Sequence, residues 1–140
     1  AYNYKEEYRF GSELLVAPII QKSYPDGYAR VKAWIPEGKW TDIFTGDEYE
    51  MAEGGKEVTL LRGVESIPVL AKWGAILPLS ADNKNAVKNP EKMDVWAFEG
   101  TGAYSLYEDG LGEGKYSALM TDFYSEFVEM DGVCMRLFVN

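Results

Sequence analysis

Residues Trp34–Gly46 read Trp-Ile-Pro-Glu-Gly-Lys-Trp-Thr-Asp-Ile-Phe-Thr-Gly, and this stretch predicts a strand, a tight turn, a second strand and a second turn. Pro36 ends the first strand because it lacks the N–H that a β-ladder needs and fixes its own φ. Gly38 can supply the positive φ that a short turn often requires. Trp40–Phe44 resumes a β-rich pattern, and Thr45 and Gly46 close it.

The sequence on both sides of this stretch continues the β pattern. In Tyr28–Ile35 the apolar side chains Val31, Ala33 and Ile35 alternate with Arg30, Lys32 and Trp34, so we expect the two sets on opposite faces of one strand. The other expected strands are Leu14–Ile20, Glu57–Leu61, Ile67–Leu70, Ala75–Leu79, Met93–Phe98, Ala103–Tyr107, Phe123–Met130 and Val133–Val139. Short strands at this spacing, separated by Gly and Pro turns, predict an all-β fold built on an antiparallel β-sandwich.

Two interruptions shape the expected domain organisation. The polar segment 81–92 has no apolar period and is interpreted as a linker between a sandwich at 10–80 and a second β domain at 93–140. The second domain has about 50 residues by this division and ends on a strong strand, so we expect it to be incomplete. Asp131 and Gly132 favour a tight hairpin turn just before that strand. The opening residues Ala1–Arg9 show no clear period and are interpreted as the end of a helix that begins upstream.

Composition excludes several classes of function. The 140 residues carry a net charge of −9, which disfavours nucleic-acid partners and anionic membrane surfaces. Histidine is absent, which removes Ser-His-Asp and Cys-His catalysis and the commonest nitrogen ligand for zinc. The single cysteine, Cys134, cannot form an internal disulfide and is interpreted as a buried, inert thiol. One cysteine and no visible signal peptide favour a cytoplasmic location, and no cofactor or metal is expected.

Two groups of residues are weighed as binding sites. Glu108, Asp109 and Glu113 surround a glycine-rich turn and can offer carboxylates to a calcium ion, but a solvated turn is the favoured interpretation because the spacing of an EF-hand is missing. The second group is the four tryptophans, which can form a flat platform on which sugar rings stack. The alternative interpretation is that they pack in a core or between domains. They are Trp34, Trp40, Trp73 and Trp96.

Four segments resemble the C-terminal region of glycoside hydrolase family 31, the α-glucosidase and α-xylosidase family. They are Phe10–Ile19, Trp34–Gly46, Ile67–Leu79 and Ser105–Gly110, in the family's order and spacing. The second resembles the family's Y-L-P-x-G-x-W-Y-D-x-W-T-G hairpin, the third its I-P-V-F-V-R-x-G-x-I-L-P strand pair, and the last its L-Y-E-D-D-G turn. The resemblance implies that residues 1–9 are the tail of the preceding barrel region.

The resemblance also implies where the chemistry of such an enzyme lies. Family members are retaining hydrolases whose nucleophile and acid/base carboxyl groups sit on a (β/α)₈ barrel, and that barrel would precede Ala1. No residue of this chain is therefore expected to be catalytic. The aromatic residues Trp34, Trp40, Phe44 and Trp73 are the candidates for contact with the barrel or with sugar.

Three functions are compared. The first is an accessory module that holds the geometry of a family 31 α-glycosidase, with the parent's own barrel as its partner and the α-glycoside substrate reached through the parent. The alternative is an autonomous carbohydrate-binding module. The third is an interaction domain of an unrelated protein. A module separated from its barrel exposes an apolar face and an unpaired strand near Val133–Val139, so we expect the chain to self-associate.

Overall fold

The computed structural model describes residues 4–81, 89–109, 118–130 and 132–140. Within these ranges the regular elements are β-strands, and all their pairings are antiparallel, which confirms the predicted all-β class. This part of the chain contains no helix that could cross a membrane. The chain divides into two compact units, Ala1–Trp73 and Gly74–Asn140, and each is described by itself.

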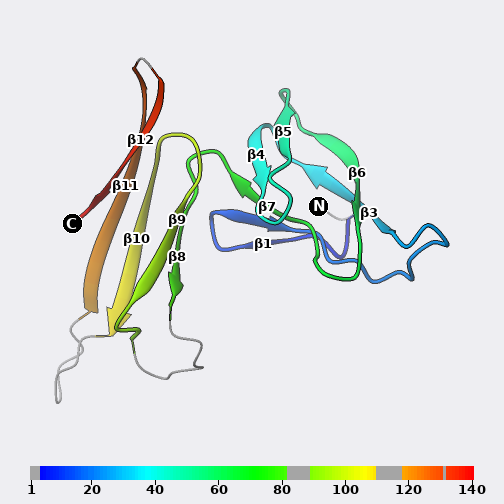
Figure 1. Ribbon diagram of the computed structural model, residues 1–140, viewed down its shortest axis with the longest axis horizontal. Coiled ribbons are helices and arrows are strands. Elements are labelled where there is room, and N and C mark those ends of the chain that lie inside the picture. Colours follow the sequence, from blue (N-terminus) through cyan, green and yellow to red (C-terminus); the bar gives the residue numbers. More distant parts are fainter. Residues whose placement is uncertain (1–3, 82–88, 110–117, 131) are drawn as a thin grey trace. The chain divides into compact units, whose positions relative to one another are not determined.

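The first unit consists of a five-stranded sheet and a two-stranded sheet (Figure 1). The larger sheet has the order β1-β2-β7-β4-β5, formed by Tyr8–Phe10, Leu14–Val16, Val69–Lys72, Gly38–Asp42 and Glu48–Met51. The smaller sheet pairs β3, Ala29–Ile35, with β6, Lys56–Arg62. One core takes side chains from both sheets, including Leu15, Trp40 and Leu70 from the larger and Ile35 and Leu60 from the smaller. The two sheets therefore face each other across a shared core, as expected for a sandwich.

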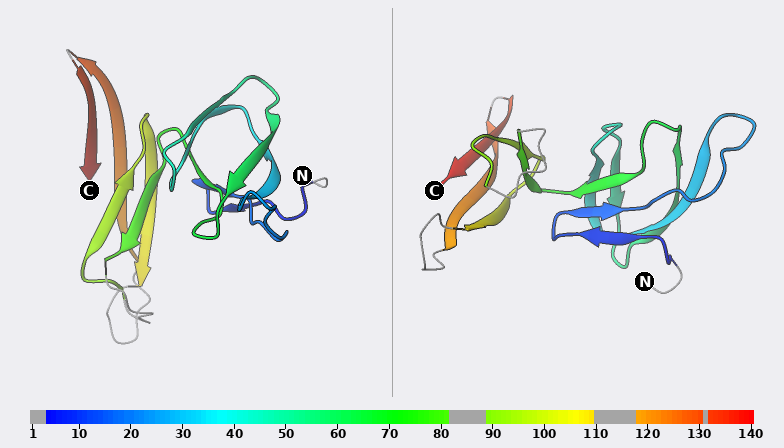
Figure 2. Two further views of the ribbon diagram at one scale, coloured as in Figure 1. Left: turned by 45° about the vertical axis from the view of Figure 1, so that its right-hand side comes forward. Right: turned by 90° about the horizontal axis from the view of Figure 1, so that it is seen from below.

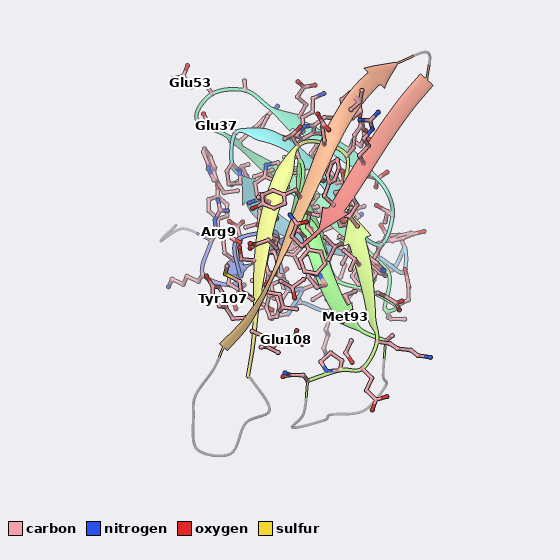
Figure 3. The ribbon with its side chains drawn as sticks, turned by 90° about the vertical axis from the view of Figure 1, so that its left-hand side faces the viewer. Arg9, Glu37, Glu53, Met93, Tyr107 and Glu108 are labelled. Atoms are coloured by element: carbon pink, nitrogen blue, oxygen red, sulfur yellow. The ribbon has the colours of Figure 1, made fainter. Side chains whose placement is uncertain are left out.

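The predicted alternation along β3 is confirmed. Ala33 and Ile35 are fully buried, whereas Trp34 between them is exposed. Gly38 has a φ of 108°, which permits the tight turn between β3 and β4. A second glycine turn joins β5 to β6, and there the N–H of Gly54 donates to Oε2 of Glu37 over 3.3 Å. The two turns therefore lie side by side, at the end where Figure 3 labels Glu37 and Glu53.

The second unit pairs β8 with β9 and arranges three longer strands in the order β10-β11-β12 (Figure 2). The strands are Ile76–Ser80, Met93–Ala97, Gly102–Asp109, Ala118–Met130 and Gly132–Val139. Phe123 on β11 and Ile76 on β8 are fully buried in this unit. The predicted hairpin of β11 and β12 is present, but Gly132, which was expected in its turn, belongs to β12 and is the partner of Met130. Residue 131 itself lies outside the described residues.

The described ends of the polar segment 81–92 join two paired strands of this second unit. Ser80 on β8 is the partner of Met93 on β9, and the N–H of Ala81 donates to the carbonyl of Lys92 over 3.1 Å. The segment was expected to link two domains, and β8 was grouped with the sandwich. The alternation within a single strand shows which of its residues share a face, but it does not specify which other strand lies beside it.

Three local expectations differ from the structure. Tyr8 and Arg9 form part of β1, which pairs with β2 through a turn at Gly11, and residues 4–9 contain no helix, so the interpretation of this described part as the end of a helix is wrong. The strand expected at Leu14–Ile20 ends at Val16, because Pro18 cannot donate to a ladder. Strand β5, Glu48–Met51, was not predicted, since its alternation of Glu and larger side chains covers four residues.

A buried ion pair connects the two sheets of the first unit. Asp42 at the end of β4 is 1% exposed and pairs with Arg62 at the end of β6, which is 6% exposed. The other carboxylate oxygen of Asp42, Oδ1, accepts the backbone N–H groups of Phe44 at 3.0 Å and Thr45 at 3.1 Å. The carbonyl of Asp42 accepts the N–H of Gly46 at 2.9 Å. One side chain therefore shapes the β4–β5 turn and fastens the sheets together.

Replacing Asp42 by alanine should lower the free energy of unfolding by about 3–5 kcal/mol, because the change leaves the Arg62 guanidinium buried without its carboxylate. Urea denaturation followed by tryptophan fluorescence measures this, since Trp34, Trp40 and Trp73 all belong to the first unit.

The control is Asp26→Asn, which removes the charge of the exposed ion pair with Arg30 (2.6 Å), keeps an oxygen for the N–H of Tyr28 (3.0 Å), and should leave the urea midpoint nearly unchanged. Equal shifts for the two variants would contradict a dominant role for the buried pair.

Candidate functional site

The four candidate aromatic residues occupy different environments. Trp40 on β4 is 5% exposed, belongs to the core, and donates through Nε1 to the carbonyl of Pro36 over 3.0 Å. Trp34 on β3 faces away from that core and is 38% exposed. Because the ring of Trp40 lies in the core between the sheets and that of Trp34 lies outside this core, the two residues do not form one platform.

Phe44 and Trp73 adjoin strands of the larger sheet, whereas Trp34 belongs to the smaller sheet. Phe44 lies in the β4–β5 turn that Asp42 shapes, and its side chain is 56% exposed. Trp73 follows β7, is half-buried, and has Nζ of Lys39 at 4.6 Å from the centre of its ring. The backbone N–H of Trp73 also donates to the carbonyl of Lys39 over 2.8 Å. The fourth tryptophan of the platform hypothesis, Trp96, lies on β9 in the second unit.

A groove of about 640 Å³ crosses the outer side of the smaller sheet. Its walls include Tyr4, Glu7, Tyr24, Arg30, Lys32 and Glu57. Next to it, the rings of Tyr4 and Trp34 are 6.0 Å apart between centroids and tilted by 38°. Sequence reasoning missed this groove, because Tyr4 and Glu7 lie in the aperiodic opening segment and Glu57 lies on a strand far along the chain.

Hydrogen bonds attach the opening segment to the smaller sheet. The hydroxyl of Tyr4 donates to Oε2 of Glu57 over 2.7 Å, and Nζ of Lys32 lies 2.8 Å from the other oxygen of Glu57. The backbone N–H of Trp34 donates to Oε2 of Glu7 over 2.6 Å. Glu7 therefore satisfies a strand N–H on the side of β3 that does not pair with β6.

Two of the carboxylates that line this groove, Glu7 and Glu57, have opposite pKa shifts. Burial is the largest cause of a raised pKa at Glu7, and the hydrogen bond from Trp34 opposes it. The pKa of Glu57 is lowered, first by the hydrogen bond from Lys32 and then by that from Tyr4. The pKa of the Tyr4 hydroxyl is raised, chiefly because it donates to Glu57. The groove thus combines the phenol rings of Tyr4 and Tyr24 with charged side chains, among which Lys32 pairs with Glu57 and Arg30 with Asp26.

The other sequence candidates fall partly outside the described residues. Glu108 lies near the end of β10, where Figure 3 labels it beside Tyr107. The side chain of Asp109, the whole of Glu113 and the side chain of Cys134 lie outside what is described, so the calcium and thiol hypotheses stay predictions. The described residues contain no group of three or more His, Cys, Asp or Glu side chains placed to hold a metal ion.

Comparison with protein families gives one match, which covers more than half of the chain. Residues 1–77 match the model described as "Glycosyl hydrolase family 31 C-terminal domain". The match takes in the whole first unit and ends within β8.

Curated relatives include two glycosidases. The chain is 28% identical over 134 residues to alpha-glucosidase 2 of Bacillus thermoamyloliquefaciens, which covers 93% of this chain and 16% of the relative. It is 30% identical over 123 residues to the alpha-xylosidase of Saccharolobus solfataricus, covering 82% of this chain and 16% of that protein. The chain therefore spans about a sixth of the length of these relatives.

Solved structures show the same fold. A GH31 dextranase from Flavobacterium johnsoniae complexed with glucose superposes with a TM-score of 0.62 at 24% identity, over 86% of this chain and 15% of that one. A cycloalternan-forming enzyme from Listeria monocytogenes in complex with a pentasaccharide substrate gives a TM-score of 0.59 at 27% identity, over 87% of this chain and 11% of that one.

Glu7→Gln should stabilise the protein at pH 7 relative to the wild type but not at pH 4. Because burial raises the pKa of Glu7 above its usual 4.5, the folded state holds more protons than the unfolded state above that pH, and stability falls as pH rises through this window. Glutamine keeps an oxygen for the Trp34 N–H and has no charge to bury. Urea midpoints at the two pH values measure the difference.

The control is Glu57→Gln, for which the expected change in stability at pH 7 has the opposite sign to that of Glu7→Gln. The lowered pKa of Glu57 contributes stability that is present at neutral pH and lost as pH falls below 4.5. This variant should be less stable than the wild type at pH 7, and the deficit should shrink in acid. If both variants change stability in the same direction with pH, the assigned environments are wrong.

Proposed function

The chain belongs to glycosyl hydrolase family 31, and from that membership we propose that it is the C-terminal accessory module of a retaining α-glycosidase. The observation that carries this proposal is the match of residues 1–77 to the family's C-terminal domain. Relatives such as the alpha-glucosidase and alpha-xylosidase are about six times longer than the aligned region, which leaves ample length for a catalytic barrel of about 250 residues.

In this proposal the chemistry belongs to the barrel of the parent protein. A retaining glycosidase needs one carboxylate as nucleophile and one carboxyl group as acid/base, held about 5–5.5 Å apart across the scissile bond. The module's role is to keep that barrel's geometry by packing against its flank. In this proposal the α-glycoside substrate binds to the barrel of the parent protein, and the groove of the smaller sheet does not bind it.

Exposed apolar side chains of the first unit support a packing role. Tyr8 is 49% exposed, Phe10 on the same strand is 65% exposed, and Phe44 in the β4–β5 turn is 56% exposed. Large apolar side chains that water reaches in a separate module are suited to burial against a neighbouring domain. Among the four aromatic candidates, we expect Trp34, Phe44 and Trp73 to make such contact, whereas Trp40 belongs to the module's own core.

Two measurements test the accessory role. The chain by itself should hydrolyse 4-nitrophenyl α-glucoside no faster than a buffer blank. Deleting the matching region from alpha-glucosidase 2 should lower that enzyme's thermal midpoint and its activity together, because the barrel loses the surface that covers its flank. A truncated enzyme with unchanged midpoint and activity would overturn the proposal.

One observation favours the alternative of an autonomous carbohydrate-binding module. Trp34 is partly exposed beside the ring of Tyr4, next to a groove lined by polar groups, and aromatic faces with nearby hydroxyls and charges suit sugar rings.

Titration with maltooligosaccharides, followed by tryptophan fluorescence, separates the two functions. The accessory role predicts no saturable change up to millimolar sugar. A saturable change that Trp34→Ala abolishes and Trp73→Ala preserves would favour the binding module instead.

We also propose that the chain self-associates when it is separated from a barrel. Its exposed aromatic and aliphatic side chains include Leu137, Phe138 and Val139 at one border of the second unit.

A further inference from the structure

Strand β12 forms the outer border of the three-stranded sheet in the second unit (Figure 1). Among the described residues its pairing is with β11 alone. Asp122 and Asn140 exchange both backbone hydrogen bonds, each over 3.0 Å. In an antiparallel ladder such doubly bonded pairs alternate with unbonded ones, so the next bonded pairs are Tyr124 with Phe138 and Glu126 with Arg136.

Because bonded and unbonded pairs alternate along β12, every second residue of this strand directs its backbone N–H and C=O away from β11. The N–H and C=O groups of Met135, Leu137 and Val139 point to the open side of β12. Open edges are usually guarded by lysine, proline or a bulge. From Met135 to Val139 the sequence offers one charge, Arg136, and no proline. Leu137 and Val139 are 41% and 55% exposed.

The β11–β12 hairpin also extends beyond the strand that supports it. Strand β10 pairs with the first part of β11, from Ala118 to Ser125, whereas β12 pairs with the last part, from Phe123 to Met130. With the bonded pair of Asp122 and Asn140 included, four residues of β11, Asp122 to Ser125, have partners on both sides, and the rest of the hairpin is a two-stranded ribbon. Such a ribbon has little stability in water by itself, and a third strand along it supplies what it lacks.

We propose that the open edge of β12 pairs with the same edge of a second copy of this chain, antiparallel and centred on Leu137. The proposal rests on the self-association proposed above and specifies where it occurs. In this register Met135 meets Val139 of the second copy, Leu137 meets its own equivalent, and about six backbone hydrogen bonds form across the three bonded pairs. The two sheets become one continuous sheet of six strands.

The position of Arg136 selects this register over its neighbour. Pairing centred on Arg136 would place two guanidinium groups directly opposite each other, which destabilises an antiparallel pair. Pairing centred on Leu137 sets Arg136 against Phe138 of the second copy instead. Both side chains are exposed, and an arginine over an aromatic face is favourable. The charge pattern of the strand therefore supports a partner with its own sequence.

The mass of the chain in solution tests the edge. Sedimentation velocity from 1 μM to 1 mM should show a concentration-dependent dimer. Leu137→Lys should raise the dimer dissociation constant by about tenfold or more, since it places two like charges at the centre of the pairing. The matched control is Leu119→Lys on β11, an exposed position in the same sheet that pairs with Glu108 of β10 and lies outside the β12 edge, and it should change the constant less than threefold.

A cross-linking measurement keeps the result clear if Leu137→Lys fails to fold. In a Cys134→Ser background, Leu137→Cys should give a disulfide-linked dimer under mild oxidation, because bonded partners in an antiparallel pair have Cα atoms about 5.5 Å apart. Leu119→Cys should remain monomeric on a non-reducing gel. Equal cross-linking of both variants would overturn the register.

The outcomes separate the two proposals. A wild-type chain that stays monomeric at 1 mM contradicts self-association and the edge together. A wild-type dimer that Leu137→Lys leaves intact contradicts the edge and leaves association through another surface. A dimer that Leu137→Lys weakens and Leu119→Lys does not supports the proposed pairing.

Discussion

The buried pair between Asp42 and Arg62 is the constraint on which the first unit depends. It joins the end of a strand in one sheet to the end of a strand in the other, and the same carboxylate orders the turn that follows. Burial lowers the pKa of Arg62, and its Nε has no hydrogen-bond partner among the described residues, so the guanidinium relies on Asp42 and on the carbonyl of Leu61. A charged pair of this kind adds little stability over an apolar core, but it strongly disfavours any arrangement that separates its members. We interpret it as the device that fixes how the two sheets lie against each other.

That arrangement also explains why the aromatic residues of the first hairpin divide between two roles. With β4 held against the core, Trp40 becomes an interior side chain whose indole N–H is satisfied by Pro36. Trp34 is left on the outer side, where the opening segment covers part of it. The proposed accessory role needs both: an interior that keeps the module rigid, and an outer surface for a neighbouring domain. A sugar platform would instead need the rings to share one face.

Much of this fold could be predicted because its strands alternate clearly and its turns use residues with strong conformational preferences. The alternation of Val31, Ala33 and Ile35 with polar neighbours predicted the buried face of β3. Gly38 predicted the turn that follows this strand. Pairing between distant strands could not be predicted in the same way: β8 alternates equally well whether it joins the first sheet or β9. The groove could not be predicted either, because it depends on contacts between residues that are distant in the sequence. Tyr4 and Glu57, for example, are 53 residues apart and are joined by one hydrogen bond. Similarly, composition singled out the tryptophans but carried no information on which way each would point.

The bond from Trp34 to Glu7 has a consequence for where this module can be cut. Glu7 occupies a backbone N–H on the unpaired side of β3, so the opening segment shields that edge as a lysine or proline would elsewhere. A domain boundary chosen at the first strand, Tyr8, would look natural on a topology diagram and would discard this shield. The start of the folded module is therefore set by a side chain that belongs to no strand, and a cut at Tyr8 would leave the N–H of Trp34 without its acceptor.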